Sequence, residues 1–345
     1  MRIFVALFLF FVLISRIVIA GPCEKLKNSV LFELKKIEQK SAKKMNITTS
    51  KGIIALSMKT INTKEELKNL LKKLGFEGYK MLITDIDNTL LDVTGGNDLG
   101  NKTPELEKFV EIMNQNAGKI LFGVATGRDA DKAIGVMYEH GMTSARIIIS
   151  RVGTEIDVLD YENRTIYSYK PWFDYLKASS PTWDAKKIGE IIGEHFKEIE
   201  AQPTNVDNVN KSSYYLKDQS PYTVEQIENV LKEHGIKDFQ AIYSSNWFLD
   251  FLPIGAGKSI CVATIMKALN IPAENVLTAD DSGNGSAMLD LKDPTHGVTR
   301  KVNGVVPANH TPDLSYLKSV PTVFFSNLPY TGALIDALQK LGWIK

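Results

Sequence analysis

Short, continuously apolar runs alternate with amphipathic helical patterns along most of this 345-residue chain. Such runs are typical of strands that are buried on both faces, and their alternation with helices predicts an α/β fold with a doubly wound, mostly parallel sheet. In sheets of this kind ligands bind at the carboxyl ends of the strands. The expected strands are residues 79–87, 119–127, 145–153, 246–255, 275–281 and 322–327, and the expected helices are 103–116, 128–141 and 258–270.

The alternation changes between residues 168 and 248. The elements expected in this stretch are an amphipathic helix at 184–200, a strand at 211–217 and a second helix at 223–235. This pattern predicts a smaller α+β cap domain inserted into a Rossmann-like core. We therefore expect the core domain to comprise residues 77–167 and 249–345, and the cap domain to comprise residues 168–248.

The first twenty residues differ from the rest of the chain. They begin with Arg2, run apolar from Ile3 to Ile14 and end with the small residue Ala20. This pattern favours a signal peptide at residues 1–20, because the apolar run is shorter than the roughly 20 residues that a membrane span needs. An uncleaved anchor is the alternative, and both imply export to the periplasm, the extracellular space or the secretory pathway. After cleavage no stable membrane span is expected.

Residues 24 to about 45 are rich in Lys and Glu, with apolar residues at helical spacing. We expect a helical N-terminal extension over residues 21–76. Its clearest part is a short helix that Thr63 and Glu66 begin with a capping-box pattern and that Gly75 ends.

The formal net charge of +1 gives no overall field that would attract nucleic acid, and no pattern in the sequence predicts a protein partner. Two cysteines, Cys23 and Cys261, are too few for a disulfide scaffold. The expected partner is therefore a small molecule.

Polar residues follow several of the predicted strands. Asp85 and Asp87 end the first, Thr126 ends the second, and Asp280 and Asp281 end a later one. Each cluster alone also fits a turn or a helix cap. Because the carboxyl ends of parallel strands share one edge of the sheet, we expect these side chains to form a single rim.

The residue types in this rim fit phosphoryl transfer. A carboxylate such as Asp85 can attack phosphorus to form an aspartyl-phosphate, and Asp87 can protonate the leaving oxygen and later activate water. A divalent cation, with Mg²⁺ expected and Asp281 as a ligand, would offset the repulsion between carboxylate and phosphate. Thr126 and Lys258 supply a hydroxyl and an ammonium group for the phosphoryl oxygens.

Four segments, "DIDNT", "VATGR", "GAGKS" and "ADDSGNG", resemble the ordered motifs of the haloacid dehalogenase superfamily of phosphatases. The insert between the second and third motifs resembles the large-cap branch of that superfamily. The segments "SRVGTEI", "NKSSYYLK", "FLDFLPIGAGKS" and "PYTGALIDALQKLGW" are similar to the sucrose-phosphate phosphatase-like family. The resemblance covers residues 79–345 and implies a Mg²⁺-dependent phosphoric monoester hydrolase that acts on a small phosphate ester.

The resemblance also implies roles for single residues. The catalytic residues would be Asp85, Asp87 and Lys258. The Mg²⁺ ligands would be Asp85, the backbone carbonyl of Asp87, and Asp281. The residues around the substrate would be Thr126, Gly127, Arg128 and Asn284.

One departure from the family pattern affects the metal site. The superfamily commonly has glycine at position 280 and an acidic residue at position 285, whereas this chain has Asp280 and Gly285. The exchange predicts weakened metal binding unless Asp280 turns inward. It also leaves open an alternative function, a secreted binding or effector protein that keeps the fold and has lost efficient turnover.

In the predicted cap strand, alternation puts Lys211, Ser213 and Tyr215 on one face. An ammonium group, a hydroxyl and a phenol suit a polyhydroxylated ligand, although an ordinary strand with a solvated lysine would show the same pattern. The similarity to sugar-phosphatase caps implies that Lys211 reaches toward the active site. The expected function is an exported Mg²⁺-dependent phosphatase of a sugar phosphate.

Overall fold

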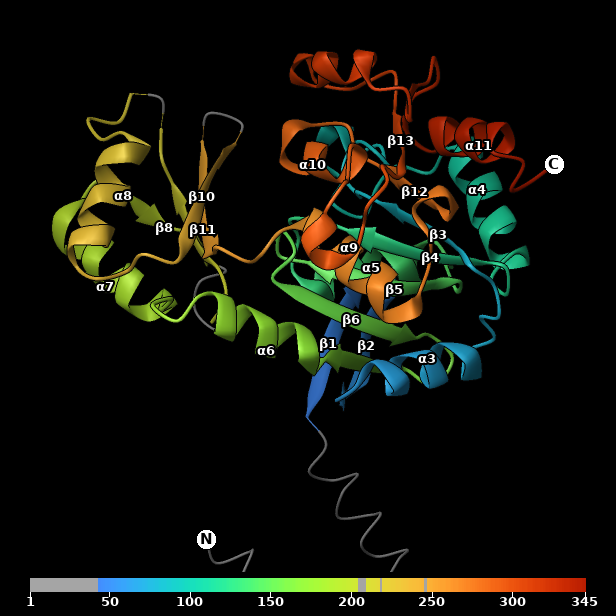
Figure 1. The fold of residues 1–345 in the computed structure, drawn as a ribbon, viewed down its shortest axis with the longest axis horizontal. Helices are drawn as coiled ribbons and strands as arrows, with labels where there is room; N and C mark the ends of the chain where they lie inside the picture. The colour runs from blue at the N-terminus through green and yellow to red at the C-terminus, as the bar shows by residue number, and fades with distance from the viewer. Residues whose placement is uncertain (1–42, 204–208, 218, 245–246) are drawn as a thin grey trace, which may run out of the picture. The chain divides into compact units, whose positions relative to one another are not determined.

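A ten-stranded sheet forms the centre of the structure, a computed structural model that describes residues 43–203, 209–217, 219–244 and 247–345 (Figure 1). Neighbouring strands are parallel from β5 through β4, β3, β12 and β13 to β14, whereas β6 runs antiparallel to both of its neighbours. In sheet order the strands are β1 (Lys44–Thr49), β2 (Gly52–Ile61), β7 (Thr165–Tyr169), β6 (Glu155–Asp160), β5 (Ala145–Ser150), β4 (Ile120–Ala125), β3 (Lys80–Thr84), β12 (Val276–Ala279), β13 (Asn303–Val306) and β14 (Val323–Phe325).

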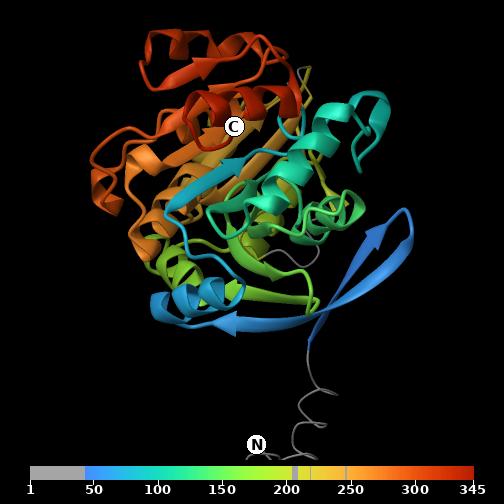
Figure 2. The ribbon, with the colours of Figure 1, turned by 90° about the vertical axis from the view of Figure 1, so that its right-hand side faces the viewer.

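Helices cover both faces of this sheet, which confirms the predicted α/β class. On one face lie α3 (Lys64–Lys73), α6 (Lys170–Ser179) and α9 (Lys258–Leu269), and on the other lie α4 (Pro104–Gln115), α5 (Ala130–Glu139) and α11 (Tyr330–Lys340). Strand β3 serves both layers, because Met81 and Ile83 pack into the first and Leu82 packs into the second. In Figure 2, α11 (dark red) lies beside α4 (teal).

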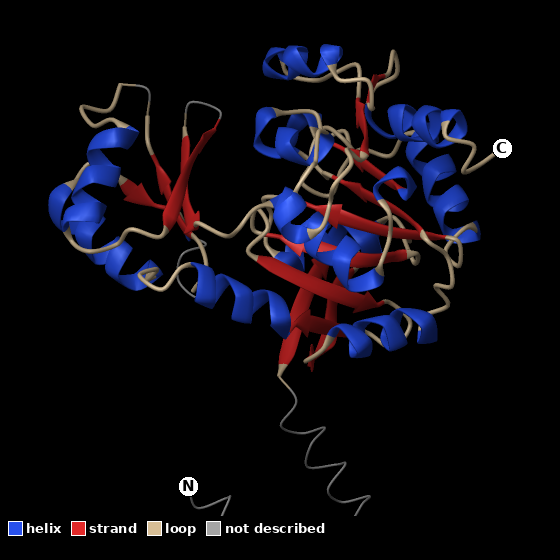
Figure 3. Ribbon diagram, viewed as in Figure 1, coloured by secondary structure: helices blue, strands red, loops and turns tan. Residues whose placement is uncertain are grey.

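A second, four-stranded antiparallel sheet has the order β10-β11-β9-β8 and its own apolar core (Figure 3). Its strands are β8 (Glu200–Ala201), β9 (Ser212–Tyr215), β10 (Phe239–Ser244) and β11 (Phe248–Pro253), and its helices are α7 (Ala185–His195) and α8 (Val224–Glu233). Ile188 and Ile192 of α7, Leu231 of α8 and Phe251 of β11 are buried together. This unit is the predicted α+β cap. The remaining elements are α10 (Ser286–Leu289) and the short 3₁₀ helices at Thr94–Gly96, Ala273–Asn275, Gly283–Gly285, Pro294–His296 and Pro312–Ser319.

The predicted helical extension is wrong for residues 44–61. They form β1 and β2 instead, and β2 pairs in parallel with β7 and so extends the core sheet. The segment "GIIALSMKTI" is rich in β-branched residues, and Gly52 supplies the φ of 120° at the turn before it. The short helix was predicted correctly: it is α3, and Thr63 caps it by accepting a hydrogen bond from the backbone N–H of Glu66 at 3.1 Å.

The predicted boundaries of the cap move at both ends. Trp172 and Leu176 place α6 in the core, whereas β11, which was expected in the core sheet, pairs with β9 and β10 in the cap sheet. The run "FLDFLP" reads as a core strand because Leu249 and Phe251 are buried in the cap core and Leu252 is buried against the core domain. Strands β6, β7, β10 and β13 were not predicted from the sequence, because each is short or lies at a chain reversal.

The proposed signal peptide at residues 1–20 and most of residues 21–43 lie outside the described part of the chain. Among the residues that the structure describes, no helix is long and apolar enough to cross a bilayer.

Candidate active site

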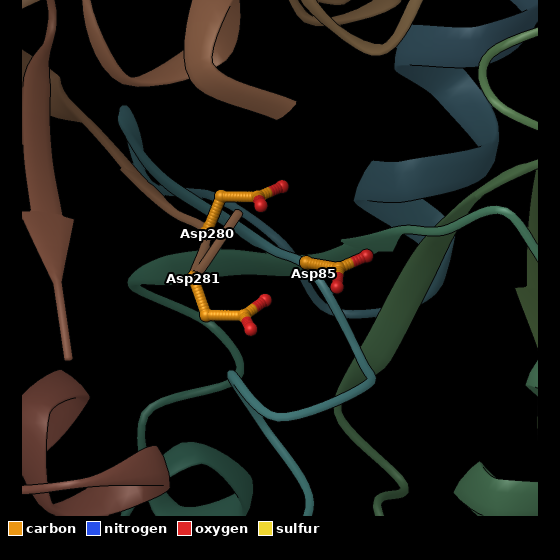
Figure 4. Close-up of side chains that lie close together, drawn as sticks. All are labelled: Asp85, Asp280 and Asp281. Carbon is orange, nitrogen blue, oxygen red and sulfur yellow. The ribbon is translucent and has the colours of Figure 1, made fainter. Parts of the chain in front are cut away.

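Three adjacent strands bring the predicted rim together. Strand β3 ends directly before Asp85, its neighbour β12 ends before Asp280 and Asp281, and its other neighbour β4 ends before Thr126. One carboxylate oxygen from each of Asp85, Asp280 and Asp281 lies within 4.8 Å of the others, and all three residues are buried (Figure 4). Carboxyl ends of parallel strands therefore supply the acidic groups, as the sequence predicts.

Lys258 joins this cluster from the first turn of α9. Its ammonium group donates to Asp85 Oδ1 at 2.8 Å and to Asp280 Oδ2 at 3.1 Å, and its side chain is only 2% exposed. The turn before α9 packs tightly, because a Cβ added to Gly153 would overlap the backbone of Gly257. Glycine is thus needed at Gly153 for Lys258 to reach the acidic cluster.

Burial dominates the electrostatics of the cluster. Burial raises the pKa of Asp85 well above its ordinary value, while Lys258 opposes the shift and Asp280 adds to it. Burial, reinforced by Asp280, raises the pKa of Asp281 to about 7. The three carboxylates exceed the one ammonium group by two charges when all are ionised, so a divalent cation would complete the balance.

The donor set fits Mg²⁺, which prefers carboxylate and carbonyl oxygens. The carboxylate of Asp281 accepts from Thr89 Oγ1 at 3.1 Å, and its backbone carbonyl accepts from the backbone N–H of Thr311 at 2.8 Å. Asp85, Asp280 and Asp281 could each offer one oxygen to such an ion, and Asp85 and Asp280 also accept from Lys258.

Asp87 is engaged by Arg128. The guanidinium donates from Nε to Asp87 Oδ2 at 2.9 Å and makes a further short contact with Oδ1. Arg128 also donates to the backbone carbonyl of Asp98, and its role in binding substrate stays a prediction. Thr126 is fully buried and its hydroxyl accepts from the backbone N–H of Arg128 at 3.2 Å, so "VATGR" forms one tight turn beside Asp87.

The cap contributes a second charged pair. Lys211 Nζ lies 3.2 Å from Asp250 Oδ2, and both side chains are almost buried. In the register of β9 and β11, Ser213 faces Asp250 and Tyr215 faces Phe248, so the predicted face of β9 continues across β11. Asp250 Oδ1 has no hydrogen-bond partner among the described residues.

These groups line one cleft with a volume of about 550 Å³. Residues of the core form the floor of the cleft, and residues of the cap form its opposite wall. The residues that line it are Asp85, Asp87, Asn88, Gly127, Arg128, Asp129, Lys132, Val152, Gln202, Lys211, Ile242, Phe248, Asp250, Asp281, Ser282 and Thr311. The cleft is large enough for a disaccharide-sized or smaller ligand.

The structure brings Asp85, Asp87, Gly127, Arg128, Lys211 and Asp281 to this cleft, with Thr126 and Lys258 packed behind them. Ser213 is buried behind the lining, and Tyr215 contacts Trp247 and Phe248, with ring centroids 6.0 Å apart in both pairs. The side chain of Asn284 lies outside the described part of the structure.

Sequence reasoning missed Gln202, Asp250 and Thr311, which also line the cleft. Asp250 carried a usable signal, because it is a single charge inside the apolar run "FLDFLP". Gln202 and Thr311 follow ordinary loop sequence, and only the tertiary fold brings them to the site.

Comparisons with known proteins agree with this geometry. Residues 79–342 match the family model of sucrose-6F-phosphate phosphohydrolase. Sucrose-phosphatase 2 of Nicotiana tabacum is 28% identical over 268 residues, which cover 75% of this chain and 58% of the tobacco protein. Mannosylfructose-phosphate phosphatase of Agrobacterium fabrum is 26% identical over 264 residues, which cover 76% of this chain and 97% of that protein.

Two solved structures share the fold. The sucrose-phosphatase of Synechocystis sp. PCC6803, in complex with sucrose and phosphate, has a TM-score of 0.60 at 23% identity and covers 77% of this chain and 98% of its own. BT1666 from Bacteroides thetaiotaomicron, a phosphatase of the haloalkanoate enzyme superfamily, has a TM-score of 0.54 at 16% identity and covers 77% and 96%.

The fold and rim therefore define a capped member of the haloacid dehalogenase superfamily, as the motifs indicated. Within it, the chain belongs to the sucrose-6F-phosphate phosphohydrolase family. The chain spans 58% of the length of the tobacco sucrose-phosphatases it matches.

Proposed function

We propose that this protein is a Mg²⁺-dependent phosphoric monoester hydrolase that cleaves a sugar phosphate through an aspartyl-phosphate intermediate. The observation that carries the proposal is the placement of Asp85. Its carboxylate lies at the floor of the cleft, 2.8 Å from the Lys258 ammonium and beside Asp281, under a cap wall that carries Lys211 and Asp250.

The first chemical step transfers the phosphoryl group to the protein. An Asp85 oxygen attacks phosphorus, a bond from phosphorus to Asp85 forms, and the bond from phosphorus to the sugar oxygen breaks. Asp87 gives its proton to that leaving oxygen. Asp87 accepts from the Arg128 guanidinium in the structure, so the carboxyl must turn away from the guanidinium to reach the leaving oxygen.

The second step returns Asp85 to its starting state. Asp87, now ionised, accepts a proton from water as the water oxygen bonds to phosphorus. The bond between phosphorus and Asp85 breaks and inorganic phosphate leaves. Lys258 balances the negative charge at Asp85 in both steps, from its position 2.8 Å away.

Mg²⁺, when bound, would neutralise charge on the phosphoryl oxygens and lower the repulsion that Asp85 meets as it attacks. Asp85, Asp281 and the backbone carbonyl of Asp87 would hold it. Thr89 keeps the Asp281 carboxylate oriented toward that place.

The core provides contacts for a phosphoryl group, which all phosphate esters share. Recognition of the leaving group therefore falls to the cap face that carries Lys211, Asp250 and Phe248. An ammonium donor beside a carboxylate acceptor suits neighbouring hydroxyls, and an aromatic ring packs on the apolar face of a sugar. This chemistry supports a sugar phosphate as the substrate.

The alternative of a fold-retaining protein without turnover rested on Gly285. Asp280 is fully buried against Lys258 and supplies a carboxylate in the same loop. The cluster therefore keeps its negative charge although position 285 is glycine. This supports the hydrolase over the alternative.

We also propose that the protein is exported, on the strength of the signal-peptide pattern at residues 1–20. N-terminal sequencing of the protein expressed with its full chain checks this. Cleavage after Ala20 supports export with signal removal, whereas a mature protein that begins at Met1 in the cytosolic fraction would contradict it.

The activity is tested with a panel of sugar phosphates and an aryl phosphate, each with Mg²⁺ and with EDTA. We expect Mg²⁺-dependent release of phosphate, with the highest kcat/KM on a sugar phosphate. The matched control is Asp174→Asn, an exposed Asp whose loss should leave turnover unchanged. Absence of Mg²⁺-dependent release across the panel, in folded protein, would refute the proposal.

A further inference from the structure

Lys258 has two carboxylate partners of different origin. Asp85 is the proposed nucleophile, whereas Asp280 has no role assigned by the mechanism. Asp280 is nevertheless fully buried and holds the ammonium group at 3.1 Å through Oδ2. Its other oxygen, Oδ1, accepts the backbone N–H of Ser282 at 3.1 Å. Both ends of this carboxylate are thus fixed, one on the backbone and one on Lys258.

The position of Asp280 depends on Gly285. A Cβ built on Gly285 would have Oδ2, Cγ and Oδ1 of Asp280 all within 3.0 Å, which is too close for atoms that are not bonded to each other. The carboxylate of Asp280 therefore occupies the space that any side chain at position 285 would need.

The backbone does not require glycine at this position. Gly285 has φ −116° and ψ 4°, which residues with a side chain adopt readily. Glycine is needed at position 285 only because the Asp280 carboxylate fills the space beside it. While Asp280 keeps its present orientation, position 285 has no room for a side chain.

We infer that Asp280 is a positioning residue for Lys258 and that Gly285 is its obligatory spatial partner. This inference rests on the proposed function, in which Lys258 balances the charge on Asp85. Because Asp280 is a second, fixed carboxylate on the same ammonium group, it keeps the orientation of Lys258 when Asp85 bonds to phosphorus. Asp280 thereby holds Lys258 in place while the charge on Asp85 changes.

The inference also revises the effect expected of an acidic residue at position 285. From sequence, Gly285→Asp adds a carboxylate to the loop. In the structure it must first displace Asp280, so the single substitution disrupts the cluster. Only together with the removal of the Asp280 side chain does position 285 gain room for a carboxylate.

A double-mutant cycle tests the spatial pairing by thermal unfolding in EDTA. Gly285→Ala should lower Tm clearly in the wild-type background, and the same change should cost little when Asp280→Gly is also present. Gly193→Ala is the matched control, because Gly193 lies in α7 with no atom near its added Cβ, and it should leave Tm unchanged or raise it. An equal loss from Gly285→Ala in both backgrounds would overturn the pairing.

Turnover tests the positioning role. Asp280→Asn keeps the shape of the side chain and removes its charge. We expect kcat on an aryl phosphate to fall about 10- to 100-fold while KM stays within about twofold, because Lys258 loses its fixed orientation. The variant Asp280→Gly/Gly285→Asp returns a carboxylate to the same space and should recover kcat above that of Asp280→Gly.

The outcomes separate this inference from the proposed function. A wild-type protein that shows no Mg²⁺-dependent turnover overturns both. An active wild type with unchanged kcat in Asp280→Asn, or with no recovery in Asp280→Gly/Gly285→Asp, overturns the positioning role alone.

Discussion

Two buried lysines, one lining the cleft and one packed behind it, come from different domains and have different surroundings. Lys258, in the core, lies between Asp85 and Asp280 with a side chain that is 2% exposed. Lys211, in the cap, pairs with Asp250 at 3.2 Å, both side chains are slightly exposed, and one oxygen of Asp250 has no partner among the described residues.

The difference indicates a division of labour. Two carboxylates hold the core lysine in one place, as a group that stabilises a transition state must be held. The cap pair retains an acceptor that a ligand hydroxyl can satisfy, as a group that selects a ligand must. Under the proposed function, the core would treat all phosphate esters alike and the cap would distinguish among their leaving groups.

The largest effect is expected from a change in the core, at the proposed nucleophile. Asp85→Asn removes the anionic attacker and keeps the shape of the side chain, so turnover should fall by at least about a thousandfold on every substrate. Steady-state assays on a sugar phosphate and an aryl phosphate check this, with circular dichroism to confirm folding. Retention of near-normal Mg²⁺-dependent turnover would exclude Asp85 as the nucleophile.

The next effect concerns the metal. Asp281→Asn removes a charge that Thr89 orients, so affinity for Mg²⁺ should fall about 10- to 100-fold, and turnover should need correspondingly more Mg²⁺. Calorimetric titration of Mg²⁺ into both proteins gives the affinities. Equal affinity in the two proteins would remove Asp281 from the ligand set.

A smaller effect is expected where the core meets the substrate. Arg128→Lys keeps the charge beside Asp87 and loses the fork that contacts both carboxylate oxygens. We expect kcat to fall about tenfold, and equally on sugar and aryl phosphates, because Asp87 is the proposed acid for every leaving group. A loss confined to the sugar phosphate would instead assign Arg128 to recognition of the leaving group.

The smallest effect lies outside both lysine sites. Burial, with Glu155 adding and a hydrogen bond from Ser168 opposing, raises the pKa of Asp157 in β6 to about 7. A raised pKa means that the folded state favours the protonated form. The resulting stability is complete below the unfolded pKa near 3.8 and is lost as the pH rises through about 7.

Asp157→Asn should therefore raise the free energy of unfolding at pH 8 by roughly 1–3 kcal/mol relative to the wild type and change it less at pH 5. Urea unfolding at both values measures the difference. A variant that is destabilised more at pH 8 than at pH 5 would show that the buried carboxylate is favourably ionised in the folded protein.

The core half of this picture was predictable from sequence because its signals are local. Asp85 and Thr126 follow their strands directly and Asp281 follows its strand by two residues, and the geometry of parallel strands brings such positions together without further information. The inward turn of Asp280 was not predictable in this way. It depends on the absence of a side chain at Gly285, five residues later, and the two positions come together only in the folded loop.

The cap half was harder to predict. The alternation in β9 predicted the face that carries Lys211, but the partner Asp250 lies in a strand that looks like a core strand, because its apolar residues are buried in both domains. The hairpin of β1 and β2 was missed for a related reason. Its Lys-rich surroundings suggested helix, and its pairing with β7, about a hundred residues away, outweighs local propensity.

The division of labour is tested most directly by the ratio of kcat/KM for the best sugar phosphate to that for an aryl phosphate, measured in the wild type and in Lys211→Ala. The account predicts that Lys211→Ala raises KM for the sugar phosphate at least about tenfold and changes turnover of the aryl phosphate by less than about twofold. Lys186→Ala, an exposed cap lysine, is the control and should leave the ratio unchanged. Equal losses on both substrates, or no loss on either, would contradict the separation of chemistry in the core from selection in the cap.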